Sequence, residues 1–153
     1  MAAKKTWTEK MHDSKDLPKV VTLKPEAAEH WHGRTMVVPA PIEVNEMMKK
    51  VSRGKLTTID NIRRQLAKKH KSEIGCPLTT GIFAWIAAFA AEEAELKGEK
   101  DITPYWRTLK TDGSLNPKYP GGVENQASRL RKEGFEIDHS KKMLRIKDFE
   151  KFI

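Results

Sequence analysis

The side chains of this sequence best suited to nucleophilic or metal chemistry are one thiol and a pair of imidazoles. Cys76 is the single cysteine and lies just before a predicted helix, a position at which the helix dipole favours a reactive thiol. No histidine is close to it in sequence, so we interpret it as a packed, inert thiol. His30 and His32 could share one face of a strand, but no third ligand with zinc-site spacing accompanies them. We therefore expect no metal site and no cofactor.

Basic side chains are the stronger candidates for binding chemistry. The sequence has no glycine-rich phosphate loop, no paired carboxylates and no Ser-His-Asp order, so its residue patterns alone indicate no enzyme. Cations on one helix face can grip phosphates, although a solvated outer face is the ordinary alternative. The basic groups of this kind are Arg63, Arg64, Lys68 and Lys69 in one predicted helix, with Lys141 and Lys142 in a later turn.

The overall charge favours the same class of partner. The 153 residues include 29 Lys and Arg against 21 Asp and Glu, for a net charge of +8. Such an excess favours polyanions, because neutralising phosphates releases condensed counterions; a merely soluble basic protein is the alternative. The start of the chain has no apolar run typical of a secretory signal, and the longest apolar stretch, residues 81–91, is about half of a membrane-spanning helix. We expect a cytoplasmic protein without a membrane segment.

Two unequal parts of the chain must position these groups. Residues 1–40 carry mixed charge and two β-like runs, 19–23 and 35–38, with prolines around them. This pattern indicates an N-terminal extension with a short hairpin. Residues 41–153 have the pattern of a single domain.

A helix-turn-helix is predicted near the start of that domain. Thr58 is a good N-cap residue for a helix over residues 59–69. Thr79 or Thr80 can cap the next helix, over residues 80–96, which is apolar nearly all round. Because such a helix must be covered, packing in a core or against a partner is the main interpretation. Only its first turn is predicted to contact DNA, because the backbone amides at a helix start suit phosphate contacts.

The domain is predicted to end in a β-ribbon. A helix over about residues 123–132 precedes two short apolar runs, 135–137 and 143–146, which can pair across a basic turn. The order helix, helix-turn-helix, loop, helix and ribbon is a winged-helix arrangement. The expected fold class is therefore α+β and mainly helical, a winged-helix-like helix-turn-helix domain with a C-terminal β-ribbon and an N-terminal extension.

Six short motifs occur in an order that is similar to that of one known family. They are Arg53-Gly54-Lys55-Leu56-Thr57-Thr58, Thr80-Gly81, Pro104-x-x-Arg107, Asp112-Gly113-Ser114-Leu115, Tyr119-Pro120-Gly121-Gly122 and Glu133-Gly134. Over about residues 42–137 the chain resembles the DNA-binding domain of the alkylguanine-DNA alkyltransferases (methylated-DNA–protein-cysteine methyltransferases). In type it is most similar to the cysteine-less alkyltransferase-like proteins.

The resemblance implies a helix-turn-helix in the minor groove of DNA, an arginine that replaces a rotated-out nucleotide, and a cysteine that accepts the alkyl group. Rotation is required because the target oxygen cannot be reached inside the base stack. Tyr105 stands at the position of that cysteine, Trp106 at its activating histidine, Leu78 at the arginine and Ile59 at a phosphate-contacting tyrosine. A phenol with a pKa of about 10 is a poor alkyl acceptor, so we expect no alkyl transfer by this route.

Two sets of candidate site residues follow from the resemblance and from the basic patches. The DNA-contacting set is Thr58, Arg63, Leu78, Thr79, Thr80, Gly81, Arg107 and Lys141. Leu78 would act as an apolar wedge in a base step. For Arg107, a structural role is the alternative to a DNA contact. The set around the base pocket is Tyr105, Trp106, Tyr119, Gly121, Gly122 and Glu133. Tyr105 and Trp106 would either stack on a base or fill the pocket.

The preferred function is therefore non-catalytic binding of double-stranded DNA, with alkylated or distorted bases as candidate targets in DNA repair. One alternative is a protein-interaction module in which residues 80–96 pack against a second copy or a repair protein. The other is an active alkyltransferase that uses Cys76 or another residue.

Overall fold

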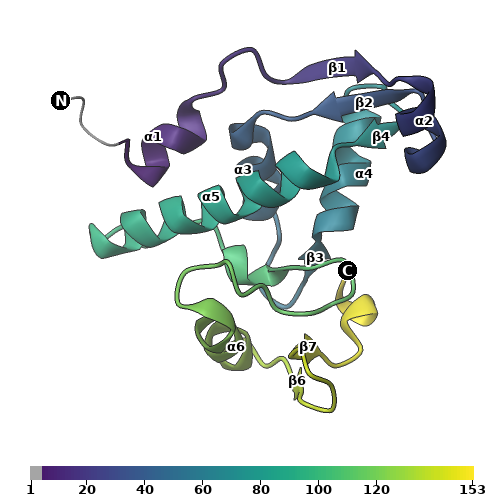
Figure 1. Ribbon diagram of the computed structural model, residues 1–153. Coiled ribbons are helices and arrows are strands. Elements are labelled where there is room, and N and C mark those ends of the chain that lie inside the picture. The colour runs from purple at the N-terminus through teal and green to yellow at the C-terminus, as the bar shows by residue number, and fades with distance from the viewer. Residues whose placement is uncertain (1–4) are drawn as a thin grey trace.

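The computed structural model describes residues 5–153 as an α+β fold in which helices dominate (Figure 1), so the expected α+β, mainly helical class is confirmed. The elements are, in chain order, α1 (Trp7–His12), β1 (Lys19–Thr22), α2 (Pro25–Trp31), β2 (Thr35–Val38), α3 (Pro41–Lys49), β3 (Thr57–Thr58), α4 (Ile59–Lys69), β4 (Ile74–Gly75), α5 (Pro77–Leu96), η1 (Tyr105–Arg107), β5 (Thr108–Leu109), α6 (Gly122–Lys132), β6 (Ile137–Asp138), β7 (Arg145–Ile146) and η2 (Phe149–Phe152). In this part of the chain, no helix is both long and apolar enough to cross a membrane.

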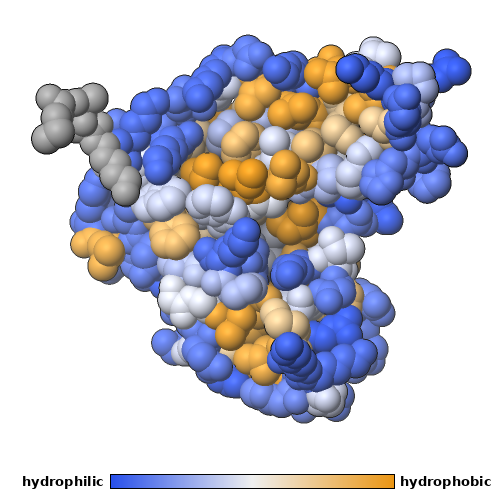
Figure 2. Space-filling view, in the orientation of Figure 1, coloured by the Kyte–Doolittle hydropathy of each residue, from blue (hydrophilic) through white to orange (hydrophobic). Residues whose placement is uncertain are grey.

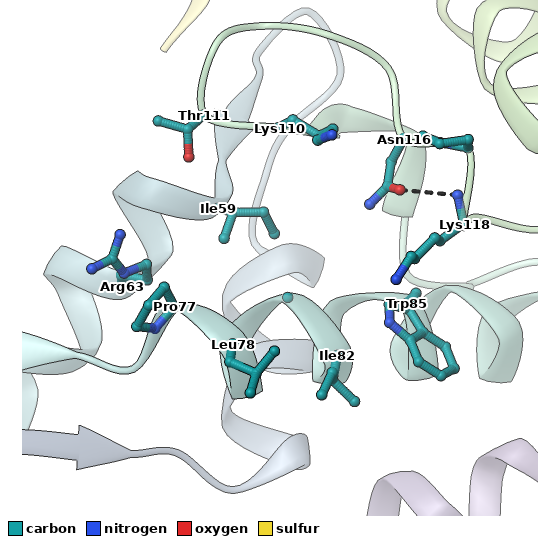
Figure 3. Close-up of a pocket in the computed structure, with 12 residues that line it drawn as sticks. Ile59, Arg63, Pro77, Leu78, Ile82, Trp85, Lys110, Thr111, Asn116 and Lys118 are labelled. Carbon is teal, nitrogen blue, oxygen red and sulfur yellow. Dashed lines mark hydrogen bonds between the residues drawn. The ribbon is translucent and has the colours of Figure 1, made fainter.

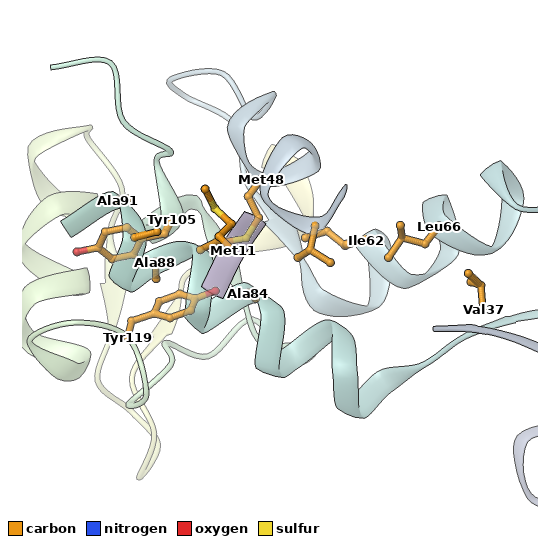
Figure 4. Close-up of a cluster of buried hydrophobic side chains, with 13 residues drawn as sticks. Met11, Val37, Met48, Ile62, Leu66, Ala84, Ala88, Ala91, Tyr105 and Tyr119 are labelled. Carbon is orange, nitrogen blue, oxygen red and sulfur yellow. The ribbon is translucent and has the colours of Figure 1, made fainter. Parts of the chain in front are cut away.

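The main core is organised around the 20-residue helix α5, which crosses the middle of the molecule (Figure 1). Helices α1, α3 and α4 pack against it. The small side chains of Ala84, Ala87 and Ala88 on α5 are fully buried and let these helices approach closely. Met48 of α3 and Ile62 of α4 belong to the same cluster (Figure 4). The apolar character of α5 therefore reflects burial on several sides.

A second cluster of buried side chains holds the lower lobe of Figure 1 together. Its members are Leu56, Leu109, Leu115, Ala127, Leu130, Phe135 and Ile146. They join α6 to the C-terminal ribbon, in which β6 and β7 pair antiparallel with Ile137 opposite Ile146. This pairing confirms the predicted ribbon. Trp106 packs against both clusters, so the two parts of the molecule share a continuous interior.

The two helices of the predicted helix-turn-helix differ in how well their starts were predicted. Helix α4 begins directly after Thr58, whose hydroxyl caps it by accepting a backbone N–H at 3.1 Å. Helix α5 begins at Pro77, so the predicted cap at Thr79 or Thr80 is wrong. Proline suits the first helical position because its φ is already helical and its missing N–H needs no partner. Thr80 lies inside the helix and donates its hydroxyl to the carbonyl of Cys76 at 2.6 Å.

The two β-like runs near the N-terminus do pair, but a helix rather than a tight turn connects them. Strands β1 and β2 are antiparallel, with Lys19 opposite Val38, and α2 lies between them in sequence. Strand β2 also pairs in parallel with β4, with Met36 opposite Ile74. The resulting sheet joins residues 19–38 to the connection between α4 and α5.

Candidate nucleic-acid interface

A groove of about 400 Å³ lies between the start of α5, the first turns of α4 and the loop that follows β5 (Figure 3). Three of the predicted DNA-contacting residues, Arg63, Leu78 and Gly81, line it together. The folded chain thus brings three separate segments, within residues 59–63, 77–85 and 110–118, to one surface.

The α5 side of the groove is an apolar wall. Leu78, Ile82 and Trp85 are spaced i, i+4 and i+7, so they lie in a row along one face of the helix (Figure 3). Ile59 and Pro77 extend this wall at the end near α4. Leu78 is 71% exposed. Apolar side chains grouped on an exposed surface mark a binding site more often than isolated ones do.

Gly81 leaves open space beside this wall. It occupies the second turn of α5, where a glycine costs about 1 kcal/mol relative to alanine. A Cβ atom added to Gly81 would meet no atom within 4 Å, so packing within the protein does not require the glycine. A ligand can therefore approach the helix backbone closely at this point.

Basic side chains border the groove on two sides. Arg63 comes from α4, and its Nε donates to the carbonyl of Gly75 at 2.9 Å, which fixes the guanidinium at the rim. Lys110 and Lys118 come from the loop after β5 and are both exposed. Cations on opposite rims are placed to contact phosphates on two sides of a bound strand or duplex.

The loop that carries the two lysines is held in place by local contacts. The Asp112 carboxylate accepts hydrogen bonds from the Ser114 hydroxyl (2.6 Å) and amide (3.0 Å), and these hold the pKa of Asp112 below its usual value. Gly113 has φ +83°, and a Cβ there would strike an aromatic ring of η2. The Asn116 side chain accepts the amide of Lys118 at 3.0 Å (Figure 3). This wall of the groove is therefore preorganised.

The remaining predicted DNA-contacting residues divide into exposed and internal ones. Lys141 is exposed in the turn between β6 and β7, and Thr79 is half-buried beside Leu78. Thr58 and Thr80 are buried, and their hydroxyls form the helix contacts described above. These two threonines therefore support α4 and α5 from inside.

Arg107 lies at the centre of an ion cluster away from the groove. Its Nε and one terminal nitrogen donate to the two carboxylate oxygens of Glu133 (2.9 and 2.8 Å), and the other terminal nitrogen donates to the carbonyl of Val51 (2.7 Å). Trp106 donates its indole N–H to the same carboxylate at 2.8 Å. Burial alone would raise the pKa of Glu133, but these hydrogen bonds outweigh it and the pKa lies below its usual value. The cluster ties α6 to η1 and to the end of α3.

Tyr105 and Tyr119 lie inside the core rather than on its surface. Tyr105 is 0% exposed and Tyr119 is 2% exposed, and their rings meet edge to face at 5.5 Å (Figure 4). The Tyr105 hydroxyl accepts from Asn125 at 2.9 Å and faces Glu92 at 3.4 Å. Burial raises the pKa of Tyr105 to about 12. The phenol therefore fills space at the position that the resemblance gives to the nucleophile.

The glycine pair before α6 has a conformational reason. Gly121 and Gly122 have φ values of +74° and +68°, a region that side chains rarely adopt. A Cβ on Gly121 would also lie 2.6 Å from the Cβ of Asn125. The pair therefore shapes the entry to α6.

Two of the predicted base-pocket residues line a different recess of about 390 Å³. Trp106 and Glu133 form part of it, together with Arg129, whose guanidinium lies 4.6 Å from the centre of the Trp106 ring. None of the six predicted base-pocket residues is among those that line the groove beside Leu78.

Sequence reasoning missed several residues of the groove. Ile82 and Trp85 were assigned to packing, although their spacing from Leu78 already places the three on one helix face. The sequence contained no pattern that marked Lys110 and Lys118 as groove residues, apart from the turn motif that lies between them. Only the fold places this turn opposite α5.

The residues first considered for nucleophilic or metal chemistry lie apart from the groove lining. Cys76 is half-buried and precedes the first residue of α5. His30 and His32 are exposed at the end of α2. Within residues 5–153, no three histidine, cysteine or acidic side chains are grouped so as to hold a metal ion.

Comparison with known proteins identifies the fold. No protein-family model matches the sequence, and no curated protein matches it significantly. The structure is similar to S. pombe ATL in complex with DNA, with a TM-score of 0.54 and 17% sequence identity over 74% of this chain and 92% of that one. It is similar, with a TM-score of 0.53 and the same identity and coverage, to S. pombe Atl1 in complex with damaged DNA containing O6-carboxymethylguanine. The resemblance deduced from the sequence motifs is thereby confirmed as a shared fold, that of the alkyltransferase-like proteins.

Proposed function

We propose that the chain is a non-catalytic DNA-binding protein of the alkyltransferase-like type, which uses the groove beside α5 to hold double-stranded DNA. Alkylated or otherwise distorted bases are its proposed targets, in DNA repair. The fold shared with two DNA-bound alkyltransferase-like structures supports this assignment, and the net charge of +8 suits a polyanion.

The single observation that carries the proposal is the composition of the groove. The exposed wedge Leu78 and the open Gly81 lie between Arg63 on one rim and Lys110 and Lys118 on the other. Cations neutralise phosphates, and an apolar wedge enters most easily at a base step that is already unstacked. A damaged or mismatched site lowers that unstacking cost, which gives a preference for distorted DNA.

The ribbon is proposed to act as a wing. Helices α4 and α5 would form the helix-turn-helix, with the first turn of α5 directed at the DNA. Lys141 is exposed at the tip of the ribbon, where a wing would contact a phosphate. The buried Thr58 and Thr80 would hold the helices in register rather than touch the backbone.

The chemistry of the site supports binding without alkyl transfer. The Tyr105 phenol is buried, hydrogen-bonded and made less acidic by burial, whereas an alkyl acceptor must be exposed and deprotonated. Cys76 does not line the groove. After incubation with O6-methylguanine DNA, we expect intact-mass spectrometry to show no methyl adduct.

The proposal is tested by fluorescence anisotropy with labelled duplexes, plain or carrying one O6-alkylguanine, over a salt series. Leu78→Ala is expected to lower the affinity for alkylated DNA about tenfold, the scale of an inserted apolar side chain. Leu96→Ala is the matched control, because Leu96 is at the other end of the same helix and is 82% exposed. Absence of binding at low salt would exclude the function, and equal effects of the two substitutions would exclude the groove.

A homodimer or a repair-protein partner on α5 is a separate proposal. The exposed apolar stripe at the start of this helix lines the groove, so a second copy or a partner that packs there would compete with DNA. Light scattering with and without a saturating duplex distinguishes the cases: a dimer that dissociates when DNA binds supports the shared surface.

A further inference from the structure

The apolar stripe of α5 is longer than the groove. Leu78, Ile82 and Trp85 continue one turn further to Phe89, so four large side chains follow one face of the helix. Apolar surface is visible over this part of the molecule in Figure 2. The N-terminal helix α1 covers only the far end of the stripe. The boundary between its covered and open parts is at Trp85.

Trp7 of α1 is the side chain that covers the stripe as far as Trp85. Its ring stacks on Phe89 with a centroid distance of 4.8 Å and an interplanar angle of 25°. It meets Trp85 in a T-shaped contact at 5.8 Å and 71°. A T-shaped pair occupies at most one face of each ring, so at least one face of the Trp85 indole is left uncovered by Trp7. Trp85 also lines the groove.

Helix α1 is firmly anchored at this place. Glu93 of α5 accepts hydrogen bonds from the amides of Trp7 and Thr8, both at 2.9 Å, and from the Thr8 hydroxyl at 3.0 Å. Lys10 lies 4.1 Å above the Trp7 ring. Met11 is buried in the main core. The N-terminal segment therefore holds Trp7 in a fixed position against α5.

We propose that Trp85 is a stacking surface for a nucleotide base in the groove and that Trp7 is the positioning residue that orients it, an inference that rests on the DNA binding proposed above. An indole that lines the groove and has at least one face not covered by Trp7, together with Lys118 and Arg63 in the same lining, combines the two features with which proteins hold an unstacked base, an aromatic platform and cations for the flanking phosphates. The N-terminal segment thereby forms part of the binding site.

A spectroscopic measurement on the full chain tests the contact itself. The four tryptophans are labelled as 5-fluorotryptophan, and their fluorine NMR signals are assigned with the four single Trp→Phe variants. Saturating alkylated duplex is expected to shift the Trp85 signal and to leave that of Trp31, on the exposed helix α2, unchanged. Binding by anisotropy with an unmoved Trp85 signal would overturn the inference and leave the proposed function intact. No binding at all would overturn the proposed function.

Substitution separates stacking from mere packing. Trp85→Leu keeps an apolar side chain but removes the ring, and it is expected to weaken binding of alkylated DNA about tenfold, as for loss of one base–aromatic stack. Trp85→Phe should retain most of the affinity. Trp31→Leu is the matched control and should bind like the wild type. Equal affinity of Trp85→Leu and the wild type would refute the stacking role.

The positioning role of Trp7 has its own readout. Trp7→Leu is expected to broaden or split the Trp85 fluorine signal in the free protein and to lower the DNA affinity, and Trp7→Phe should restore both. An unchanged Trp85 signal and affinity in Trp7→Leu would exclude positioning by Trp7. If Trp7→Leu does not fold, Glu93→Gln replaces it, because this change weakens the anchor of α1 without altering a ring.

Discussion

Leu78 and Gly81 are two residues that the folded chain does not need for its own stability. Leu78 exposes most of its side chain, and no protein atom would obstruct a side chain at Gly81. Tyr105 shows the opposite relation, because it stands where the family that the chain resembles has a reactive group and yet is fully buried. For single residues of the groove, we therefore expect one and the same substitution to change the stability of the protein and its affinity for DNA in opposite directions.

Substitution of Gly81 tests this separation. Gly81→Ala should stabilise the protein by about 1 kcal/mol, because alanine has the higher helix propensity, and raise the Tm by about 2–4 °C. Gly81→Leu should also fold but fill the groove and lower the DNA affinity at least about tenfold. Thermal unfolding and anisotropy check the two effects. A destabilised Gly81→Ala variant would show that the glycine is required by the fold.

At the scale of elements, one ion cluster joins three segments that are distant in sequence. Arg107 in η1 binds Glu133 after α6 and the carbonyl of Val51 after α3. The side chains of Arg107 and Glu133 are 12% and 6% exposed, so each ion depends on the other for its solvation. Arg107, which was predicted to contact DNA, and Glu133, which was predicted to line the base pocket, thus connect the lower lobe to the main core.

This cluster should make stability depend on pH. The pKa of Glu133 in the folded state lies below its ordinary value of 4.5, so its contribution is complete above that pH and is lost as the pH falls through the folded-state pKa. Arg107→Ala is expected to cost about 3–5 kcal/mol at pH 7, because it leaves a buried carboxylate unpaired. Urea unfolding at pH 7 and pH 4 measures both effects.

The conservative variant is the control for this experiment. Glu133→Gln should lose less stability than Arg107→Ala at pH 7, because it leaves no unpaired buried anion. Its stability should also fall less steeply than that of the wild type between pH 5 and pH 3. Parallel pH profiles for the wild type and Glu133→Gln would contradict a role for this carboxylate.

At the scale of the whole molecule, the positive charge is unevenly distributed. Residues 53–71, which include α4, contain seven lysines and arginines and one acidic residue. Residues 53–71 therefore contribute most of the net charge of +8. Lys110 and Lys118 add cations on the other side of the groove. A duplex held between them would be bound largely through its phosphates.

The salt dependence of DNA binding reports this arrangement. The slope of log affinity against log salt should fall by about 0.9 for each phosphate contact removed. We expect such a decrease for Lys110→Gln and again for Lys118→Gln, of equal size for plain and alkylated duplexes. Lys100→Gln, outside the groove lining, is the control. Slopes that match the wild type would place the phosphates elsewhere.

The sequence by itself determined the local structure and the resemblance of the fold to a known one. Helix α4 and the C-terminal ribbon follow from apolar periodicity, cap residues and turns, because these signals act between residues close in the chain. The order of six motifs was sufficient to indicate the alkyltransferase-like fold, which the structural similarity then confirmed. Pro77 rather than a threonine opens α5, although a proline at the first helical position is itself a local signal.

Only the tertiary structure decided which side chains share a surface. Lys118 and Leu78 are 40 positions apart, and Trp7 and Trp85 are 78 apart, yet the fold places each pair at one site. It also buried Tyr105 and tied Arg107 to Glu133, although the same residue types could equally have faced a ligand. Exposure and pairing of this kind are set by contacts between distant segments, and no local pattern encodes them.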